Sequence, residues 1–179
     1  MTVDHCFESF ASQFPFPIKK AIRVPSSIEI TSLTKADAPT VAEFVYLLID
    51  EFAPGAGPDR RAMTAIAQEV LPLESVSGFL AKIDSTPVGV MLINECAAIY
   101  AGGKFGEISE LYVRPEYRSK GVAAPLLDAA GRHAEDSGWK RLEVGAPNQP
   151  AWERTLKFYL REGFEEVGPR LRKLISQEG

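Results

Sequence analysis

Residues 107–127 are the part of the chain whose residue types and spacing most directly indicate chemistry. They read EISELYVRPEYRSKGVAAPLL, which predicts an alternating strand that ends at Pro115, a turn, and a helix of small and apolar residues. The turn, here called the anion loop, consists of Arg118, Ser119, Lys120, Gly121, Val122 and Ala123. Gly121 accepts any backbone angle, and the unpaired N–H groups at the start of a helix suit a pyrophosphate.

Two better-known phosphate-binding motifs are excluded by their spacing. A Walker loop needs G-x-x-x-x-G-K-[ST], with lysine after glycine, whereas Lys120 precedes Gly121. A dinucleotide fingerprint needs G-x-G-x-x-G, but this turn contains a single glycine. The remaining alternative is an ordinary strand-to-helix connection with surface charges.

The anion loop resembles the acyl-CoA-binding motif of the GNAT superfamily of N-acetyltransferases, [R/Q]-x-x-G-x-[G/A]. Arg118, Gly121 and Ala123 match its three fixed positions, which are weakly specific on their own. The preceding LYVRPEY, and FYLREGFEEVG at Phe158 to Gly168, occur in the order and at roughly the distance typical of the family. The combined match covers about the C-terminal half of the chain and is much more specific.

This resemblance implies a mixed α/β fold, with a central twisted mixed sheet of about six to seven strands and helices on both faces. In such folds the strands after the motif diverge, acyl-CoA enters between them, and the amine arrives from the opposite side. The resemblance also implies acetyl-CoA as acyl donor, with main-chain groups of Leu111 and Val113 beside the pantetheine arm and the oxyanion. Asn148 resembles the family asparagine that contacts this arm. Its spacing to the following tyrosine is stretched, so a role in a loop turn is equally compatible.

Acetyl transfer to an amine needs a neutral nucleophile, a stabilised oxyanion and a proton for the thiolate leaving group. Tyr159 is the candidate proton donor, because a phenol with a reference pKa of about 10 stays protonated at neutral pH. It precedes Gly163 by four residues, where the resembling family places its general-acid tyrosine. Tyr159 also shares a predicted helical face with Leu156 and Leu160, so a packing role is the alternative.

Glu107 and Glu110 on the motif strand are the candidate bases that could deprotonate the amine. They are three residues apart, so simple alternation predicts that they lie on opposite faces of the sheet. We favour Glu110, which shares its face with Tyr112 and lies nearer the end of the strand. For each glutamate the alternative is an ordinary polar position in a strand.

Periodicity and breaking residues predict the elements that must hold these side chains. The predicted strands are 28–33, 76–83, 88–100, 108–113 and 141–145, with a final hairpin over 164–175. The predicted helices include residues 41–52, 63–70, 123–134 and 152–162. We expect residues 1–26 to form an N-terminal extension on the domain or on a partner subunit, as in a homodimer. Residues 27–179 are expected to form a single acetyltransferase domain.

Composition and charge indicate which classes of partner and which cellular location to expect. A net charge of −4 and a pI near 5.3 argue against nucleic acid, and no apolar run approaches the roughly 20 residues that span a bilayer. The first residues lack an export signal, so a cytoplasmic location is expected. The two cysteines and two histidines show no zinc-site spacing, so no metal is expected.

A span without Lys or Arg in the N-terminal half contains five carboxylates: Asp37, Glu43, Asp50, Glu51 and Asp59. They indicate either solvated helix faces or the border of a site for a cationic amine. The sequence therefore predicts an enzyme that transfers acetyl from acetyl-CoA directly to a primary amine of a small molecule, for example a polyamine or an aminoglycoside-like cation. A protein amine as acceptor, and a non-catalytic acyl-CoA-binding or assembly module, are the alternatives.

Overall fold

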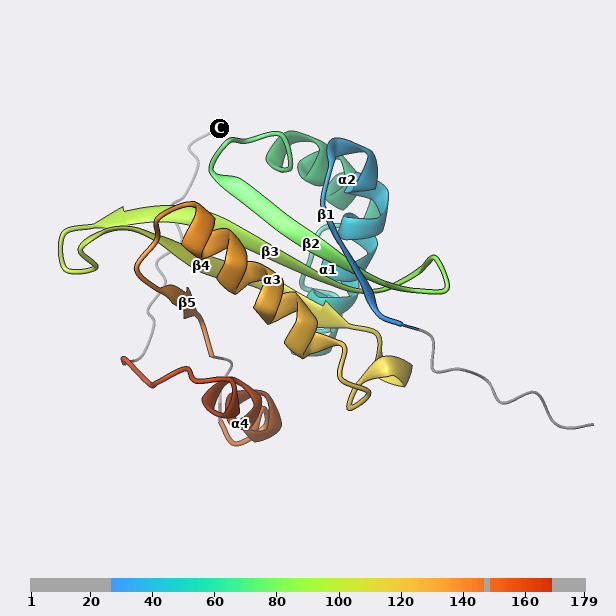
Figure 1. Cartoon of the computed structure of the whole chain (residues 1–179). Helices are drawn as coiled ribbons and strands as arrows, with labels where there is room; N and C mark the ends of the chain where they lie inside the picture. Colours follow the sequence, from blue (N-terminus) through green and yellow to red (C-terminus); the bar gives the residue numbers. More distant parts are fainter. Residues whose placement is uncertain (1–26, 147–148, 169–179) are drawn as a thin grey trace, which may run out of the picture.

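The computed structural model describes residues 27–146 and 149–168, which form a five-stranded sheet with helices on both sides (Figure 1). The strands lie in the order β1-β2-β3-β4-β5; the first three pairings are antiparallel and β4 with β5 is parallel. The strands are β1 (Glu29–Ser32), β2 (Val76–Ile83), β3 (Thr86–Ala98), β4 (Gly103–Val113) and β5 (Leu142–Val144). The helices are α1 (Ala38–Phe52), α2 (Arg60–Val70), α3 (Ala123–Asp136) and α4 (Glu153–Arg161), with short 3-10 turns at Lys35–Asp37 and Pro115–Tyr117.

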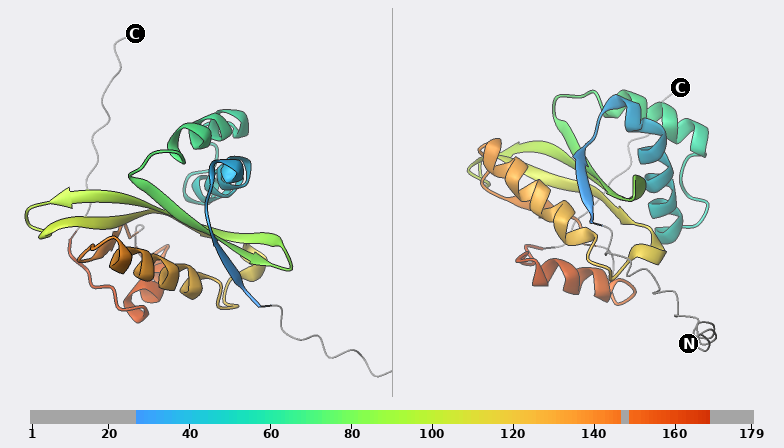
Figure 2. Two further views of the ribbon diagram at one scale, coloured as in Figure 1. Left: turned by 45° about the horizontal axis from the view of Figure 1, so that its top comes forward. Right: turned by 45° about the vertical axis from the view of Figure 1, so that its right-hand side comes forward.

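The helices form two layers around the sheet (Figures 1 and 2). α1 and α2 cover one face, where Phe44 packs against Leu80, Val90 and Tyr112. α3 and α4 lie on the other side. The core of that face joins Leu126 and Ala130 of α3 to strand residues Met91, Ile93 and Ile108. Each leucine- or isoleucine-sized side chain buried in this way contributes about 1.5–3 kcal/mol to folding.

Local sequence explains where the helices on the α1 face begin. The carboxylate of Asp37 accepts hydrogen bonds from the backbone N–H and the hydroxyl of Thr34, which holds the 3-10 turn that leads into α1. The side chain of Asp59 accepts a 2.8 Å hydrogen bond from the backbone N–H of Ala62 at the start of α2. The turn before α1 and the start of α2 are therefore held by local hydrogen bonds, and the apolar stripes of both helices face the sheet.

The α/β class is confirmed, and so is the predicted order of elements from the first strand to α4, whereas the described residues hold fewer strands than the sequence predicted for the whole domain. They contain five strands instead of six to seven. Phe164–Gly168, predicted to start a final hairpin, forms no strand. The backbone N–H of Phe164 instead donates to the carbonyl of Tyr159, and the two rings lie 5.3 Å apart. This segment therefore closes the end of α4. Residues 169–175 of the predicted hairpin and the extension 1–26 lie outside the described residues.

The described helices include none that is long and apolar enough to cross a membrane.

Candidate active site

β4 and β5 pair over a short stretch and then diverge. β5 pairs with Gly106, Glu107 and Ile108 of β4, whereas β4 continues to Val113. Within the described part of the chain, residues 109–113 therefore have no strand partner on the β5 side. This is the divergence that the family resemblance predicted, and Leu111 and Val113 both lie in it.

The anion loop ends at an uncapped helix. Gly121 adopts a φ of +80°, and Cβ built there would meet no atom within 4 Å. Among the described side chains none caps the first turn of α3, which leaves its N–H groups available. Ser119 also has a positive φ of 61°, a conformation that costs a non-glycine residue about 1–3 kcal/mol. An open helix start behind a strained turn fits a pyrophosphate.

The side chain of Arg118 is engaged within the protein. Its Nε donates to the carbonyl of Val113 at 2.8 Å, and its Nη2 lies 2.6 Å from Oε1 of Glu51. The guanidinium also lies over the ring of Tyr112, 5.3 Å from its centre. In this arrangement Arg118 positions the anion loop, and its main chain is the part left for a phosphate. The carbonyl of Val113 is likewise already an acceptor.

α4 and the end of α1 both contact this region. Arg154 of α4 donates a hydrogen bond to the hydroxyl of Ser119 in the anion loop. Trp152, just before α4, lies against Phe52 at the end of α1, with ring centres 4.4 Å apart. Phe52 remains 46% exposed, so this stacking lies at the surface and not in the core. The position of α4 relative to the anion loop is thus held from two sides.

Tyr159 is buried on α4, with 5% of its surface exposed. Its ring lies between Phe158 and Phe164, each 5.3 Å away between ring centres. Burial raises the pKa of Tyr159 to about 12, so the phenol stays protonated throughout the neutral range. This environment fits the packing role and preserves the proton that a general acid requires.

Glu107 and Glu110 lie on the same face of β4, so the predicted opposite placement is wrong. Leu92 pairs with Glu110, but its neighbour Ile93 pairs with Ile108, which leaves Ser109 as an extra residue in β4. Such a bulge reverses the alternation that follows it. Glu107 pairs with Asn94 and Glu110 with Leu92, two positions of β3 that share a face. Both carboxylates thus belong to the α1–α2 side.

Glu110 borders a small cavity between α1, α2 and the sheet, here called the α1–α2 cavity. Burial raises the pKa of Glu110, the hydroxyl of Ser109 donates to its carboxylate and opposes this rise, and the negative charge of Glu107 adds to it. The cavity measures about 90 Å³. Its other lining residues are Val41, Ala42, Val45, Met63, Ile66, Ala67, Val70, Leu71 and Leu92.

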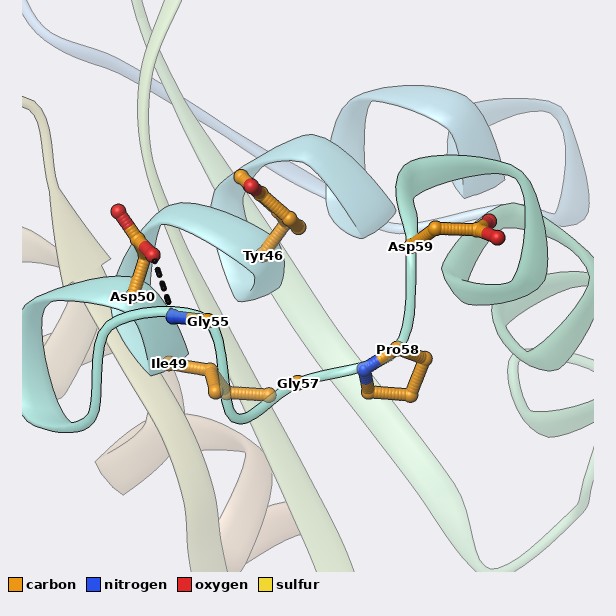
Figure 3. Close-up of a pocket in the computed structure, with 7 residues that line it drawn as sticks. All are labelled: Tyr46, Ile49, Asp50, Gly55, Gly57, Pro58 and Asp59. Carbon is orange, nitrogen blue, oxygen red and sulfur yellow. Dashed lines mark hydrogen bonds between the residues drawn. The ribbon is translucent and has the colours of Figure 1, made fainter.

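A larger and more polar cavity of about 240 Å³ lies at the α1–α2 connection and is here called the loop cavity (Figure 3). Asp50 and Asp59 contribute to its lining, together with Tyr46 and Ile49. The carboxylate of Asp50 accepts from the N–H of Gly55 at 3.1 Å, and Asp59 is turned towards the start of α2 (Figure 3). Both acidic side chains therefore stabilise nearby backbone, Asp50 at the α1–α2 connection and Asp59 at the start of α2.

All five carboxylates that the sequence singled out have partners inside the chain. Besides the hydrogen-bonded Asp37, Asp50 and Asp59, Glu43 pairs with Arg60 and Glu51 pairs with Arg118. Their local roles explain much of the acidic pattern. Asn148 lies outside the described residues. Sequence reasoning missed Ser109 and the contact of Glu51 with the anion loop.

The model of the acetyltransferase (GNAT) family matches residues 42–164, more than half of the chain. The chain belongs to the GNAT family. The members of this family are acetyl-CoA-dependent acyltransferases.

Individual proteins that this chain resembles include several N-acetyltransferases. An uncharacterized N-acetyltransferase of Methanocaldococcus jannaschii is 33% identical over 92 residues, which cover 49% of this chain and 38% of that protein. This chain thus spans well under half the length of that relative. The crystal structure of a ribosomal-protein-alanine N-acetyltransferase from Brucella melitensis biovar Abortus 2308 superposes with a TM-score of 0.67 at 21% identity, covering 83% of this chain and 100% of the other.

An aminoglycoside N-acetyltransferase in complex with CoA gives a TM-score of 0.66 at 18% identity, covering 88% of this chain and 99% of that one. At these identities the two solved structures establish the fold and leave the acceptor open.

The described residues contain no group of three or more His, Cys, Asp or Glu side chains suited to a metal ion.

Proposed function

We propose that this protein transfers the acetyl group of acetyl-CoA directly to a primary amine of a small molecule. The observation that carries the proposal is the arrangement around the end of β4. The open start of α3 follows this strand on one side, and the carboxylate of Glu110 faces the α1–α2 layer on the other. Donor and acceptor can therefore approach the same strand from opposite sides.

The proposed reaction begins with loss of a proton from the ammonium to Glu110, directly or through a water molecule. The neutral nitrogen then attacks the thioester carbonyl carbon and forms the C–N bond. Main-chain N–H groups in the diverging residues 109–113 are the proposed donors to the developing oxyanion. As the C–S bond breaks, the sulfur takes the proton of Tyr159, which its raised pKa keeps in place until then. The nitrogen then loses its second proton, which returns through water to the Tyr159 oxygen, so the products are the neutral amide, the CoA thiol and the proton held by Glu110.

The names of the structural neighbours include both acceptor classes, an aminoglycoside and a ribosomal protein. The cavity beside Glu110 measures about 90 Å³, room for a small group and not for a folded protein segment, which supports a small-molecule acceptor. The placement of Glu110 in this cavity favours catalysis over a non-catalytic acyl-CoA-binding module.

A thiol-release assay with acetyl-CoA and a panel of primary amines tests the proposal. Mass spectrometry of the amine should show a gain of one acetyl group, with one equivalent of CoA released. A binding titration with CoA run in parallel separates donor binding from transfer. If CoA binds but none of the amines is acetylated, the proposed function is wrong.

A further inference from the structure

The α1–α2 cavity has an unusual composition for a site that receives a cation. Nine apolar side chains and a single carboxylate line it. We propose that it receives the short aliphatic group of the acceptor, and that the substrate is a monoamine whose ammonium meets Glu110. This inference rests on the proposed acetyltransferase function and names its substrate class.

Charge is the first argument. Three acidic side chains of α1 and the α1–α2 connection, which could have bound a polycation, already have partners: Glu43 pairs with Arg60, Glu51 pairs with Arg118, and Asp59 caps the start of α2. Glu110 alone among the cavity-lining residues is charged, so one ammonium can be neutralised there. A second ammonium on the far side of the cavity would be buried among Met63, Ala67 and Val70 without a partner, which is strongly unfavourable.

Size is the second argument. A cavity of about 150 Å³ lined by apolar side chains accepts benzene, so the 90 Å³ of the α1–α2 cavity suits a smaller group of a few carbons. A sugar ring of an aminoglycoside is too large and too polar for it. Ile66, one of the lining residues, is 45% exposed, so the cavity lies close to the molecular surface.

A matched pair of substrates tests this on the unaltered protein. n-Butylamine and 1,4-diaminobutane share a four-carbon chain and have amines of similar pKa, but the second carries a further ammonium on its terminal carbon. We expect kcat/KM for butylamine to exceed that for the diamine by roughly tenfold or more, because one methylene alone is worth 10–200-fold in an apolar pocket. Kanamycin and a peptide with a free N-terminus complete the panel.

Ala67→Leu fills the cavity from α2, where Ala67 is 8% exposed. It should raise KM for butylamine roughly tenfold, affect ethylamine less, and leave the dissociation constant of CoA unchanged. Ala65→Leu is the matched control, since Ala65 lies exposed on the same helix and outside the cavity lining. Circular dichroism establishes that each variant is folded.

The outcomes distinguish the two proposals. Faster turnover of the diamine, kanamycin or the peptide than of butylamine would overturn the monoamine inference and leave an acetyltransferase. If Ala67→Leu does not fold, the comparison of butylamine with the diamine decides on its own. Acetylation of none of these amines, with CoA still bound, would overturn both proposals.

Discussion

Oε1 of Glu51 lies 2.6 Å from Nη2 of Arg118, which joins the last turn of α1 to the anion loop. The same guanidinium donates to the carbonyl of Val113 and covers the ring of Tyr112. Burial and the charge of Glu51 raise the pKa of Tyr112. One arginine thus joins the anion loop to both β4 and α1.

Glu51→Gln should weaken CoA binding a few-fold while changing the free energy of unfolding by about 1 kcal/mol or less. The small stability effect is expected because both side chains are partly exposed, 38% for Arg118 and 29% for Glu51. Calorimetric titration with CoA and chemical denaturation measure the two effects. Glu153→Gln, which removes the exposed pair with Lys157, is the control. Equal CoA affinities for the two variants would show that the Glu51 contact does not position the loop.

CoA should stabilise the folded protein by about 2.7 kcal/mol at a hundredfold excess over its dissociation constant. For a chain of this size, that corresponds to a rise in melting temperature of roughly 5–10 °C. Gly121→Val should remove most of this rise, because its φ of +80° strains any side chain and Cβ would stand where the anion approaches. A thermal shift assay measures both effects.

The control is Gly131→Ala on α3, where Cβ meets no atom within 4 Å and φ is not positive. This substitution should raise stability by about 0.5–1 kcal/mol and keep the CoA-dependent rise. If saturating CoA does not change the melting temperature of the unaltered protein, the proposal that acetyl-CoA is the acyl donor is wrong.

The sequence predicted the parts of the site that depend on local pattern. A glycine before a run of small residues predicts the positive φ of Gly121 and the helix that follows it. The pattern FYLREGF singles out Tyr159 and predicts the helix that carries it. The bulge at Ser109 could not, because it depends on pairing with β3 and leaves no mark in the alternation of β4 itself. The contact of Glu51 with Arg118 joins residues 67 positions apart, and so depends on how α1 packs on the sheet.

Tyr159→Phe should lower turnover by roughly 10²–10⁴, the usual contribution of a general acid, while the melting temperature barely moves. The ring keeps its contacts with Phe158 and Phe164, so only the proton donor is lost. With a pKa of about 12, the parent phenol should not lose activity through its own ionisation below pH 10. Tyr100→Phe, at an exposed position, is the control. Parent-like turnover of Tyr159→Phe would assign the residue to packing alone.

Glu110→Gln should be more stable than the parent at neutral pH. Burial in the folded protein raises the pKa of Glu110 above its ordinary value. The folded protein therefore loses stability as pH rises through that raised pKa and the buried carboxyl group ionises. Glutamine has no proton to lose, and the stability advantage should close as pH falls below the unfolded pKa, about 4.3. Denaturation between pH 4 and 8 measures this difference.

Glu95→Gln is the control with the opposite sign. Hydrogen bonds from Lys104 and Trp139 lower the pKa of Glu95, so its carboxylate stabilises the fold above the unfolded pKa and this contribution is lost as pH falls through the folded pKa. The glutamine variant should be less stable than the parent at neutral pH, with the difference closing in acid. If Glu110→Gln behaves in the same way, Glu110 is not destabilised by its surroundings.

Glu107→Gln should shift the pH dependence of kcat without abolishing it. The negative charge of Glu107 helps to raise the pKa of Glu110, so its removal should lower that pKa and move the acidic limb of the kcat profile to lower pH. Glu110→Gln should instead reduce kcat across the profile and remove this limb. Steady-state kinetics with one amine and saturating acetyl-CoA, from pH 5 to 9, separate these results. A limb that disappears in Glu107→Gln and persists in Glu110→Gln would make Glu107 the base, which the bulge at Ser109 permits by placing both carboxylates on one face.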